Sequence, residues 1–145
     1  MATEPRTIRP RLLLHPPFVS MGGTLLIAAF VTDWEYSNTS LFQWANFSAW
    51  LITGGLVLAL IAAVLLAVDL LIGSAGRVRL LPLILLAVAA IVSIFNVFVH
   101  SRDAWTSVVP TGIILSAIAA ILLLIVAFLG WSVTDGRARV EEDRP

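Results

Sequence analysis

The sequence predicts an all-α fold, specifically an integral membrane four-helix bundle. Of the 145 residues, 59% are hydrophobic and only 12% are charged, against about 25% charged residues in typical globular domains. The hydrophobic residues are concentrated in four long segments, with the polar residues mainly between them and at the chain ends. In lipid, each segment has to pair its backbone polar groups internally, which a helix does.

We expect one transmembrane domain over residues 12–133, with helices at about 17–34, 41–73, 80–101 and 108–133. A first helix of about 18 residues would extend about 27 Å, close to the bilayer core of about 30 Å. Residues 33–40 read as a polar turn. Residues 1–11 are expected to form a loosely ordered cytoplasmic arm, and the charged residues 134–145 a disordered cytoplasmic tail.

The arginines predict the orientation. The chain has nine basic residues, all of them arginine, and the first and third loops together contain only Arg102. The other eight lie in the N-terminal arm, the second loop and the tail: Arg6, Arg9, Arg11, Arg77, Arg79, Arg137, Arg139 and Arg144. Because basic loops stay on the cytoplasmic side, both termini are expected inside. The arginine-only, alanine- and leucine-rich composition suggests a bacterial protein, hence the inner (plasma) membrane.

Small residues recur every fourth position along the second helix, at Gly55, Ala59, Ala63 and Ala67. Helices in lipid associate through close van der Waals approach, which small residues permit. This stripe therefore predicts a helix–helix contact, and with it a homo-oligomer or a membrane-complex partner. The lipid bilayer itself is the other expected partner, and nucleic acid is not expected.

Polar residues form two layers in this orientation. His15 opens the first helix and Asp69 lies about one turn from the end of the second, so the two could pair on the inner side. Ionisable residues within membrane spans are costly and are candidates for function, although a purely structural role is the alternative for both. The outer layer contains the other candidates: Asp33, Asn96, His100, Arg102 and Asp103.

The outer layer is centred on the third helix. Ser93, Asn96 and His100 follow one another at helical spacing and share one face. Arg102 and Asp33 could close over that face from the membrane interface, where charges near helix ends can also simply reach water. A ligand or proton role and a structural role both remain open for this layer, and an interhelical hydrogen bond is the expected use of Asn96.

The sequence lacks the residues that several kinds of catalytic and cofactor-binding site require. The chain has no cysteine, and no clustered histidines could complete a zinc site. His15 and His100 fall at opposite faces of the membrane, so they cannot ligate one haem within a monomer. No serine lies in a nucleophile-elbow context, and no glycine loop could hold a phosphate. We therefore expect neither catalytic activity nor a metal or other cofactor.

The chain resembles the bacterial membrane proteins catalogued as domain of unknown function 2231 over roughly residues 12–131. The run from Phe98 to Trp105, followed by Val109-Pro110, is similar to that of actinobacterial members. The other matching features, in order, are His15-Pro16, Asp33, Asp69, Asn96 with Arg102, Leu115-Ser116 and Gly130-Trp131.

The resemblance implies a four-helix inner-membrane domain without an assigned activity. Some relatives are joined to Rieske-type iron–sulfur domains, which suggests membrane redox chemistry. Many members carry a further histidine in the third span and a Tyr-Arg-His segment after the Gly-Trp pair, whereas this chain has Ser132-Val-Thr-Asp135-Gly-Arg137 there. That departure weakens a redox function for this chain.

Three functional hypotheses follow. The first is a non-catalytic accessory or scaffold subunit that associates through its small-residue stripes. The second is a redox-associated module that binds quinone or haem at the outer layer. The third is a small transporter or proton-conducting oligomer that uses Asp69 and Asp33.

Overall fold

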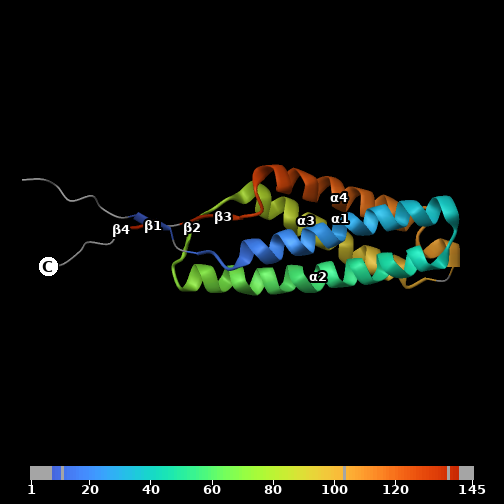
Figure 1. Ribbon diagram of the computed structural model, residues 1–145, viewed down its shortest axis with the longest axis horizontal. Coiled ribbons are helices and arrows are strands. Elements are labelled where there is room, and N and C mark those ends of the chain that lie inside the picture. Colours follow the sequence, from blue (N-terminus) through green and yellow to red (C-terminus); the bar gives the residue numbers. More distant parts are fainter. Residues whose placement is uncertain (1–7, 11, 103, 137, 141–145) are drawn as a thin grey trace, which may run out of the picture.

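The computed structural model describes residues 8–10, 12–102, 104–136 and 138–140. Four long helices run antiparallel in one elongated bundle (Figure 1): α1 (His15–Thr39), α2 (Phe42–Leu71), α3 (Leu80–His100) and α4 (Thr111–Leu129). A short 3-10 helix, η1 (Ala104–Ser107), connects α3 to α4. All four helices are long and apolar enough to cross a membrane, which confirms the predicted all-α membrane fold.

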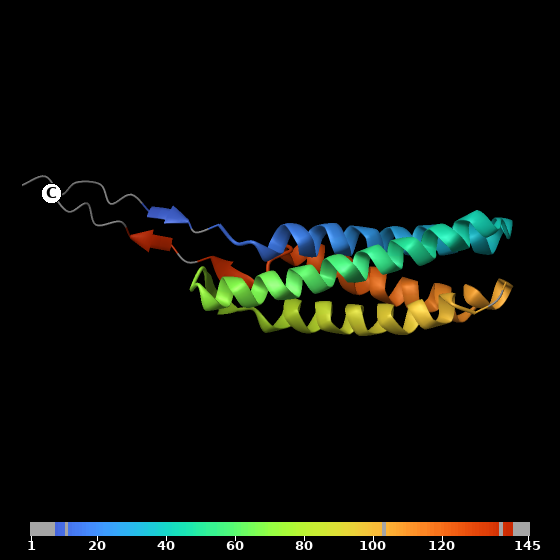
Figure 2. The ribbon, with the colours of Figure 1, turned by 90° about the horizontal axis from the view of Figure 1, so that it is seen from below.

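Each helix packs against two neighbours. α1 contacts α2 and α4, and α3 contacts α4 and α2, so the helices follow one another around the bundle axis. The α1–α2 contact is the most extensive and the α2–α3 contact the least. Four antiparallel helices return the chain to its starting end, and the described ends lie together beyond one end of the bundle (Figure 2). We call this the termini end, and the opposite end, with the α1–α2 turn and η1, the turn end.

The interior is made mostly of small and branched apolar side chains. One cluster joins all four helices in the middle of the bundle: Leu26, Ala29, Ile52, Ala89 and Leu123. A second lies at the turn end, where Tyr36 packs against Ala45 and Val108. Most other large apolar side chains are exposed, for example Phe128 at 91%. In a chain with four candidate spans, such an outward-facing apolar surface is the surface that contacts lipid.

α1 is longer at both ends than the sequence indicates. The expected polar turn at residues 33–40 is wrong up to Thr39, because the helix continues through Asp33 and ends at Thr39. Side chains of the last turn support it: the Asn38 amide donates to the carbonyl oxygen of Trp34, and the Thr39 hydroxyl to that of Glu35. Ser40 then ends the helix with a left-handed backbone, φ 55°.

α4 is shorter than the expected span at residues 108–133. It begins at Thr111, directly after Pro110, and no side chain of its N-cap residue bonds the first turn. It ends at Leu129, where Gly130 adopts a positive φ of 83°. α2 and α3 begin and end within two residues of their expected bounds, 41–73 and 80–101.

Parts of the arm and the tail are strands, where the sequence suggested loose structure. β2 (Ala75–Val78) pairs antiparallel with β3 (Thr134–Gly136), and β1 (Ile8–Pro10) with β4 (Ala138–Val140). The backbones of β2 and β3 approach closely, since a Cβ on Gly76 would lie 2.5 Å from the carbonyl oxygen of Asp135. The expectation of disorder for residues 134–145 is therefore wrong for 134–136 and 138–140. The rest of the arm and tail, residues 1–7, 11, 137 and 141–145, lies outside the described part.

Candidate functional site: two buried histidine–aspartate pairs

Two histidine–aspartate pairs lie inside the bundle, one near each end, and each joins α1 to another helix. His15 of α1 pairs with Asp69 of α2 at the termini end, with 2.8 Å between Nδ1 and Oδ2. Asp33 of α1 pairs with His100 of α3 at the turn end, with 2.9 Å between Oδ1 and Nε2. The four side chains are 0–2% exposed. We call them the His15 pair and the His100 pair.

In the His15 pair, Asp69 caps the first turn of α1 from the neighbouring helix. Its carboxylate accepts the backbone N–H of Leu14 at 2.9 Å and that of His15 at 3.1 Å. The first four N–H groups of a helix have no partner within it. Pro16 and Pro17 carry no N–H, so Asp69 and the two prolines account for all four positions. The carboxylate also lies at the positive end of the α1 dipole, where negative charge is stabilising.

The hydrogen bonds of His15 define its tautomer. Nε2 lies 3.3 Å from the backbone nitrogen of Val133, a group that can only donate, so Nε2 is the accepting nitrogen and carries no proton. Nδ1 then carries the ring proton and donates it to Asp69. In this arrangement Nδ1 of His15 donates, Nε2 accepts, and Asp69 accepts from the ring and from the backbone of α1.

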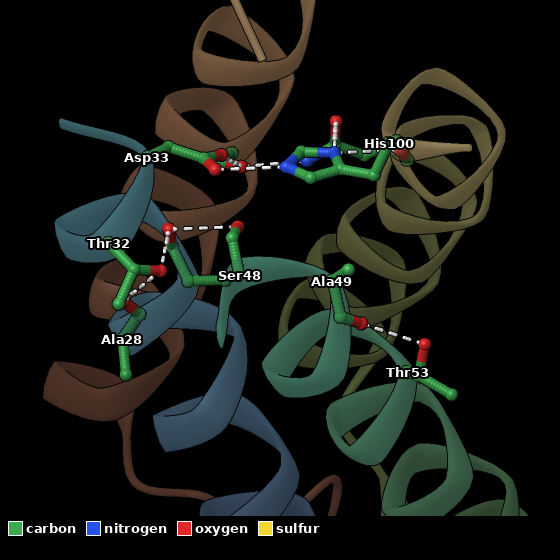
Figure 3. A network of polar contacts seen from close by, with 10 residues as sticks. Ala28, Thr32, Asp33, Ser48, Ala49, Thr53 and His100 are labelled. Atoms are coloured by element: carbon green, nitrogen blue, oxygen red, sulfur yellow. Dashed lines mark hydrogen bonds and ion pairs between the residues drawn. The ribbon is translucent and has the colours of Figure 1, made fainter. Parts of the chain in front are cut away.

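The His100 pair belongs to a larger network across α1, α3 and α4. Figure 3 shows Asp33 and His100 facing each other across the gap between their helices. The other carboxylate oxygen of Asp33 accepts the hydroxyl of Ser116 on α4. That hydroxyl accepts the side-chain N–H of Asn96 at 2.7 Å. Nδ1 of His100 lies 3.0 Å from the carbonyl oxygen of Asn96 and 3.1 Å from its side-chain oxygen.

These partners give His100 a different hydrogen-bonding pattern from His15. Nδ1 of His100 faces two acceptors on Asn96, so it is the donating nitrogen. Nε2 faces the Asp33 carboxylate. The two pairs are thus alike in residue type and differ in which ring nitrogen bonds the aspartate, Nδ1 in His15 and Nε2 in His100.

Small residues allow the network to close. A Cβ on Gly112 would lie 3.0 Å from Cε1 of His100 and 2.9 Å from the carbonyl oxygen of Ser107. One layer toward the middle of the bundle, hydroxyls on α1 and α2 bond to backbone carbonyls (Figure 3). Ser48 donates to Ala29 at 3.3 Å, and Thr32 to the same oxygen at 2.9 Å.

The structure brings together most of the sequence-predicted candidates. His15 pairs with Asp69 as expected, and Asp33, Asn96 and His100 form one network. The expectation that Arg102 closes over this network with Asp33 is wrong: Arg102 is exposed, and the described ion pair of Asp33 is with His100. Asp33 is also not at a helix end near water, because it is 0% exposed within α1. Asp103 lies outside the described residues.

Ser116 is a network member that the sequence did not single out as a site residue. In the sequence it belongs to the family resemblance at Leu115-Ser116 and to a second small-residue stripe, Gly112, Ser116 and Ala120, on the otherwise apolar fourth helix. Such a hydroxyl between small residues is placed to reach a polar group on a facing helix.

The small-residue stripe of α2 serves more than one surface. Gly55 and Ala59 contact α1, since a Cβ on Gly22 would lie 3.0 Å from the Gly55 oxygen and 3.4 Å from the Ala59 nitrogen. Ala63 lines a cavity inside the bundle. Ala67 is exposed on the outer surface of the bundle. The predicted contact at Gly55 and Ala59 is therefore made within the chain, and only the Ala63–Ala67 part is left for an outside partner.

Among the described residues, no group of three or more His, Cys, Asp or Glu side chains is placed to hold a metal ion. In the described part of the chain, the buried side-chain polar atoms have hydrogen-bond partners, except for the Thr134 hydroxyl. Both pairs therefore resemble structural polar networks, in which each buried group is satisfied by another.

Comparison with known protein families shows which family the chain belongs to. A family model described as "Predicted membrane protein (DUF2231)" matches residues 11–140. The chain belongs to this family. The match confirms the resemblance found in the sequence and extends it to β4. The comparisons of this DUF2231 protein with curated proteins and with solved structures gave no match, and the family description names no activity.

Proposed function

We propose that this DUF2231 protein is a non-catalytic accessory or scaffold subunit of a bacterial plasma-membrane complex. The observation that carries this proposal is the internal pairing of the buried polar side chains. The buried polar side chains form hydrogen bonds with one another or with the backbone; they are His15, Asp69, Asp33, His100, Asn96 and Ser116. Residues paired in this way fix helix positions, so the outer surface of a rigid bundle is left to act on partners.

Haem binding within one chain is disfavoured by the same geometry. Both nitrogens of each histidine have partners within the chain. The histidines also lie at opposite ends of the bundle, because α1 and α3 both begin at the termini end, where His15 opens α1, and His100 closes α3. A ligand at either histidine would have to break a buried pair first, which costs several kcal/mol.

Proton conduction through a single bundle is disfavoured by the apolar side chains between the two histidine–aspartate pairs. Asp33 follows His15 by 18 positions on one helix, which corresponds to about 27 Å. The interior between the two pairs is lined by the apolar side chains of Leu26, Ile52 and Leu123, which are 1–5% exposed. Such side chains provide no hydrogen-bonding group along which a proton could pass.

The experiment is isolation of the protein from its own membrane in polymer nanodiscs, followed by native mass spectrometry. We expect a complex of fixed stoichiometry, and the masses distinguish a second copy from a different subunit. Ala67→Phe should weaken that complex, because it enlarges the exposed part of the stripe. Leu71→Phe, on the same helix at a position already 86% exposed and large, is the matched control.

Three outcomes would contradict the proposal. The first is a protein that is always isolated alone. The second is a proton flux in liposomes that disappears with Asp33→Asn or Asp69→Asn, which would favour the transporter hypothesis. The third is a haem signature in the reduced-minus-oxidised spectrum, which would favour the redox hypothesis.

A further inference from the structure

A cavity of about 170 Å³ lies inside the bundle, in the half nearest the termini end. The inner wall comes from α1 and α4, where Gly22, Gly23 and Leu123 are buried. The side walls are short alanine side chains of α2 and α3, and the His15 ring lines the cavity as well. The cavity exists because alanine occupies most of the lining positions on α2 and α3, where larger side chains would fill the space.

The mouth of the cavity lies between α2 and α3, the neighbouring helices that contact each other least. Ala63 of α2 and Ala87 of α3 line the cavity and are exposed at the surface of the bundle. Both lie in the interior of helices that are apolar enough to span the membrane. The medium at the mouth is therefore the hydrocarbon of the bilayer rather than water.

The lining determines which chemical group can enter. Apart from His15, the lining side chains are apolar or absent, and the ring nitrogens of His15 are already bonded to Asp69 and Val133. A headgroup or a quinone ring would find no free hydrogen-bonding partner there, whereas a hydrocarbon chain needs none. The volume is similar to that of an engineered apolar cavity of about 150 Å³ that stays dry and binds benzene or xenon.

We propose that this cavity binds the hydrocarbon tail of a membrane lipid, which enters from the bilayer between Ala63 and Ala87. The tail fills space that the short side chains leave open and restores van der Waals contacts to Leu26 and Leu123. The tail of a phospholipid and the chain of an isoprenoid lipid share this chemistry. The proposal concerns the inside of the bundle and shares one position with the accessory role, Ala63, which lines the mouth and belongs to the exposed part of the stripe.

The test uses a phospholipid with a photoreactive diazirine at the end of its tail, with the purified protein in nanodiscs. After illumination, the modified residues are mapped by mass spectrometry. Exposed positions such as Phe128 should be labelled in any case. We expect additional adducts on Leu26 and Leu123, which are 5% and 2% exposed and which a tail reaches only by entering. Adducts confined to exposed residues would overturn the proposal.

Two matched variants separate the cavity from the surrounding surface. Ala63→Phe places a ring at the mouth, and we expect loss of the adducts on Leu26 and Leu123. Ala67→Phe makes the same change one turn further along α2, on the exposed surface outside the cavity lining, and should leave them intact. Equal loss in both variants would contradict the proposal. If Ala63→Phe does not fold, Ala87→Phe closes the mouth from the opposite wall.

Competition identifies the source of the tail. Loss of the buried adducts on adding unlabelled phospholipid supports an acyl chain, and loss only with an unlabelled isoprenoid lipid supports an isoprenoid chain. Buried adducts that neither competitor reduces would overturn the proposal, because they would not report a binding site. A dimer that forms without buried adducts and is lost in Ala63→Phe would overturn it too, and would assign the mouth to a second copy.

Discussion

At the scale of single residues, Asp69 joins two helices by capping one of them. Its carboxylate accepts two backbone N–H groups of α1 and the ring N–H of His15. Asp69→Asn keeps the shape and removes the charge facing the helix dipole, so we expect a loss of about 2 kcal/mol in unfolding free energy. Thermal unfolding in detergent measures this loss.

The control for Asp69→Asn is Asp135→Asn, the same change at an exposed position in β3. It should leave the unfolding temperature unchanged. A similar shift in both variants would show that the charge at the start of α1 contributes nothing specific.

The two histidines use their ring nitrogens differently, and this difference can be observed. Nitrogen NMR of labelled histidine should show one bare ring nitrogen for His15, because Nε2 accepts from Val133. For His100 it should show protonated Nδ1 and a strongly hydrogen-bonded Nε2. In Asp33→Asn the side-chain N–H can donate to Nε2, so His100 should then show a bare Nε2. Identical spectra for the two wild-type histidines would contradict the assignment.

The sequence predicts the His15 pair better than the His100 network, for a physical reason. The helical rise fixes the depth of each residue, so a residue opening the first span and one closing the second are expected at one level. Direction around the helix axis depends on packing. The sequence therefore could not show that Asp33 points inward to His100 and Ser116, nor that Arg102 points outward.

At the scale of elements, α1 and α2 are held together by the close approach of Gly22 and Gly55. A Cβ on Gly55 would lie 2.7 Å from Cγ of Leu26 and 3.1 Å from the Gly22 oxygen. Gly55→Ala should therefore destabilise the bundle by about 1–3 kcal/mol through overpacking. Chemical unfolding in detergent checks this value.

Gly54 provides the comparison in the same helix turn. A Cβ there would meet only Cδ1 of Leu25, at 3.4 Å. Gly54→Ala should be neutral or slightly stabilising, because alanine favours a helix over glycine by about 1 kcal/mol. If both variants behaved alike, the α1–α2 contact would not depend on the missing side chain of Gly55.

Element boundaries show where composition alone misleads. The C-terminal end of α1 is polar, yet it stays helical. The side chains of Asn38 and Thr39 bond carbonyl oxygens one turn earlier in the helix, and Tyr36 packs in the interior. The segment after α4 is short of apolar residues, yet residues 134–136 pair with β2. Strand pairing between segments more than 50 residues apart leaves no local pattern in the sequence. The four spans were predictable because their apolar length is a local property.

At the scale of the whole molecule, polar networks near both ends of the bundle enclose an apolar middle. The His15 pair joins α1 to α2 and to the segment after α4, and the His100 pair joins α1 to α3 and α4. Four antiparallel spans place both described chain ends on one side of the membrane (Figure 1). The arginines predict that this side is the cytoplasm, because the strand segments at the termini end carry Arg9, Arg77 and Arg139.

The absence of native cysteine makes this orientation directly testable. Gln43 is exposed in the first turn of α2 at the turn end, and Asp135 is exposed in β3 at the termini end. In spheroplasts, a membrane-impermeant maleimide should label Gln43→Cys at once and Asp135→Cys only after permeabilisation. Neither substitution removes an arginine, so the charge bias that sets the orientation is unchanged. The reverse labelling pattern would place the termini outside, and labelling of both positions in intact spheroplasts would contradict a four-span topology.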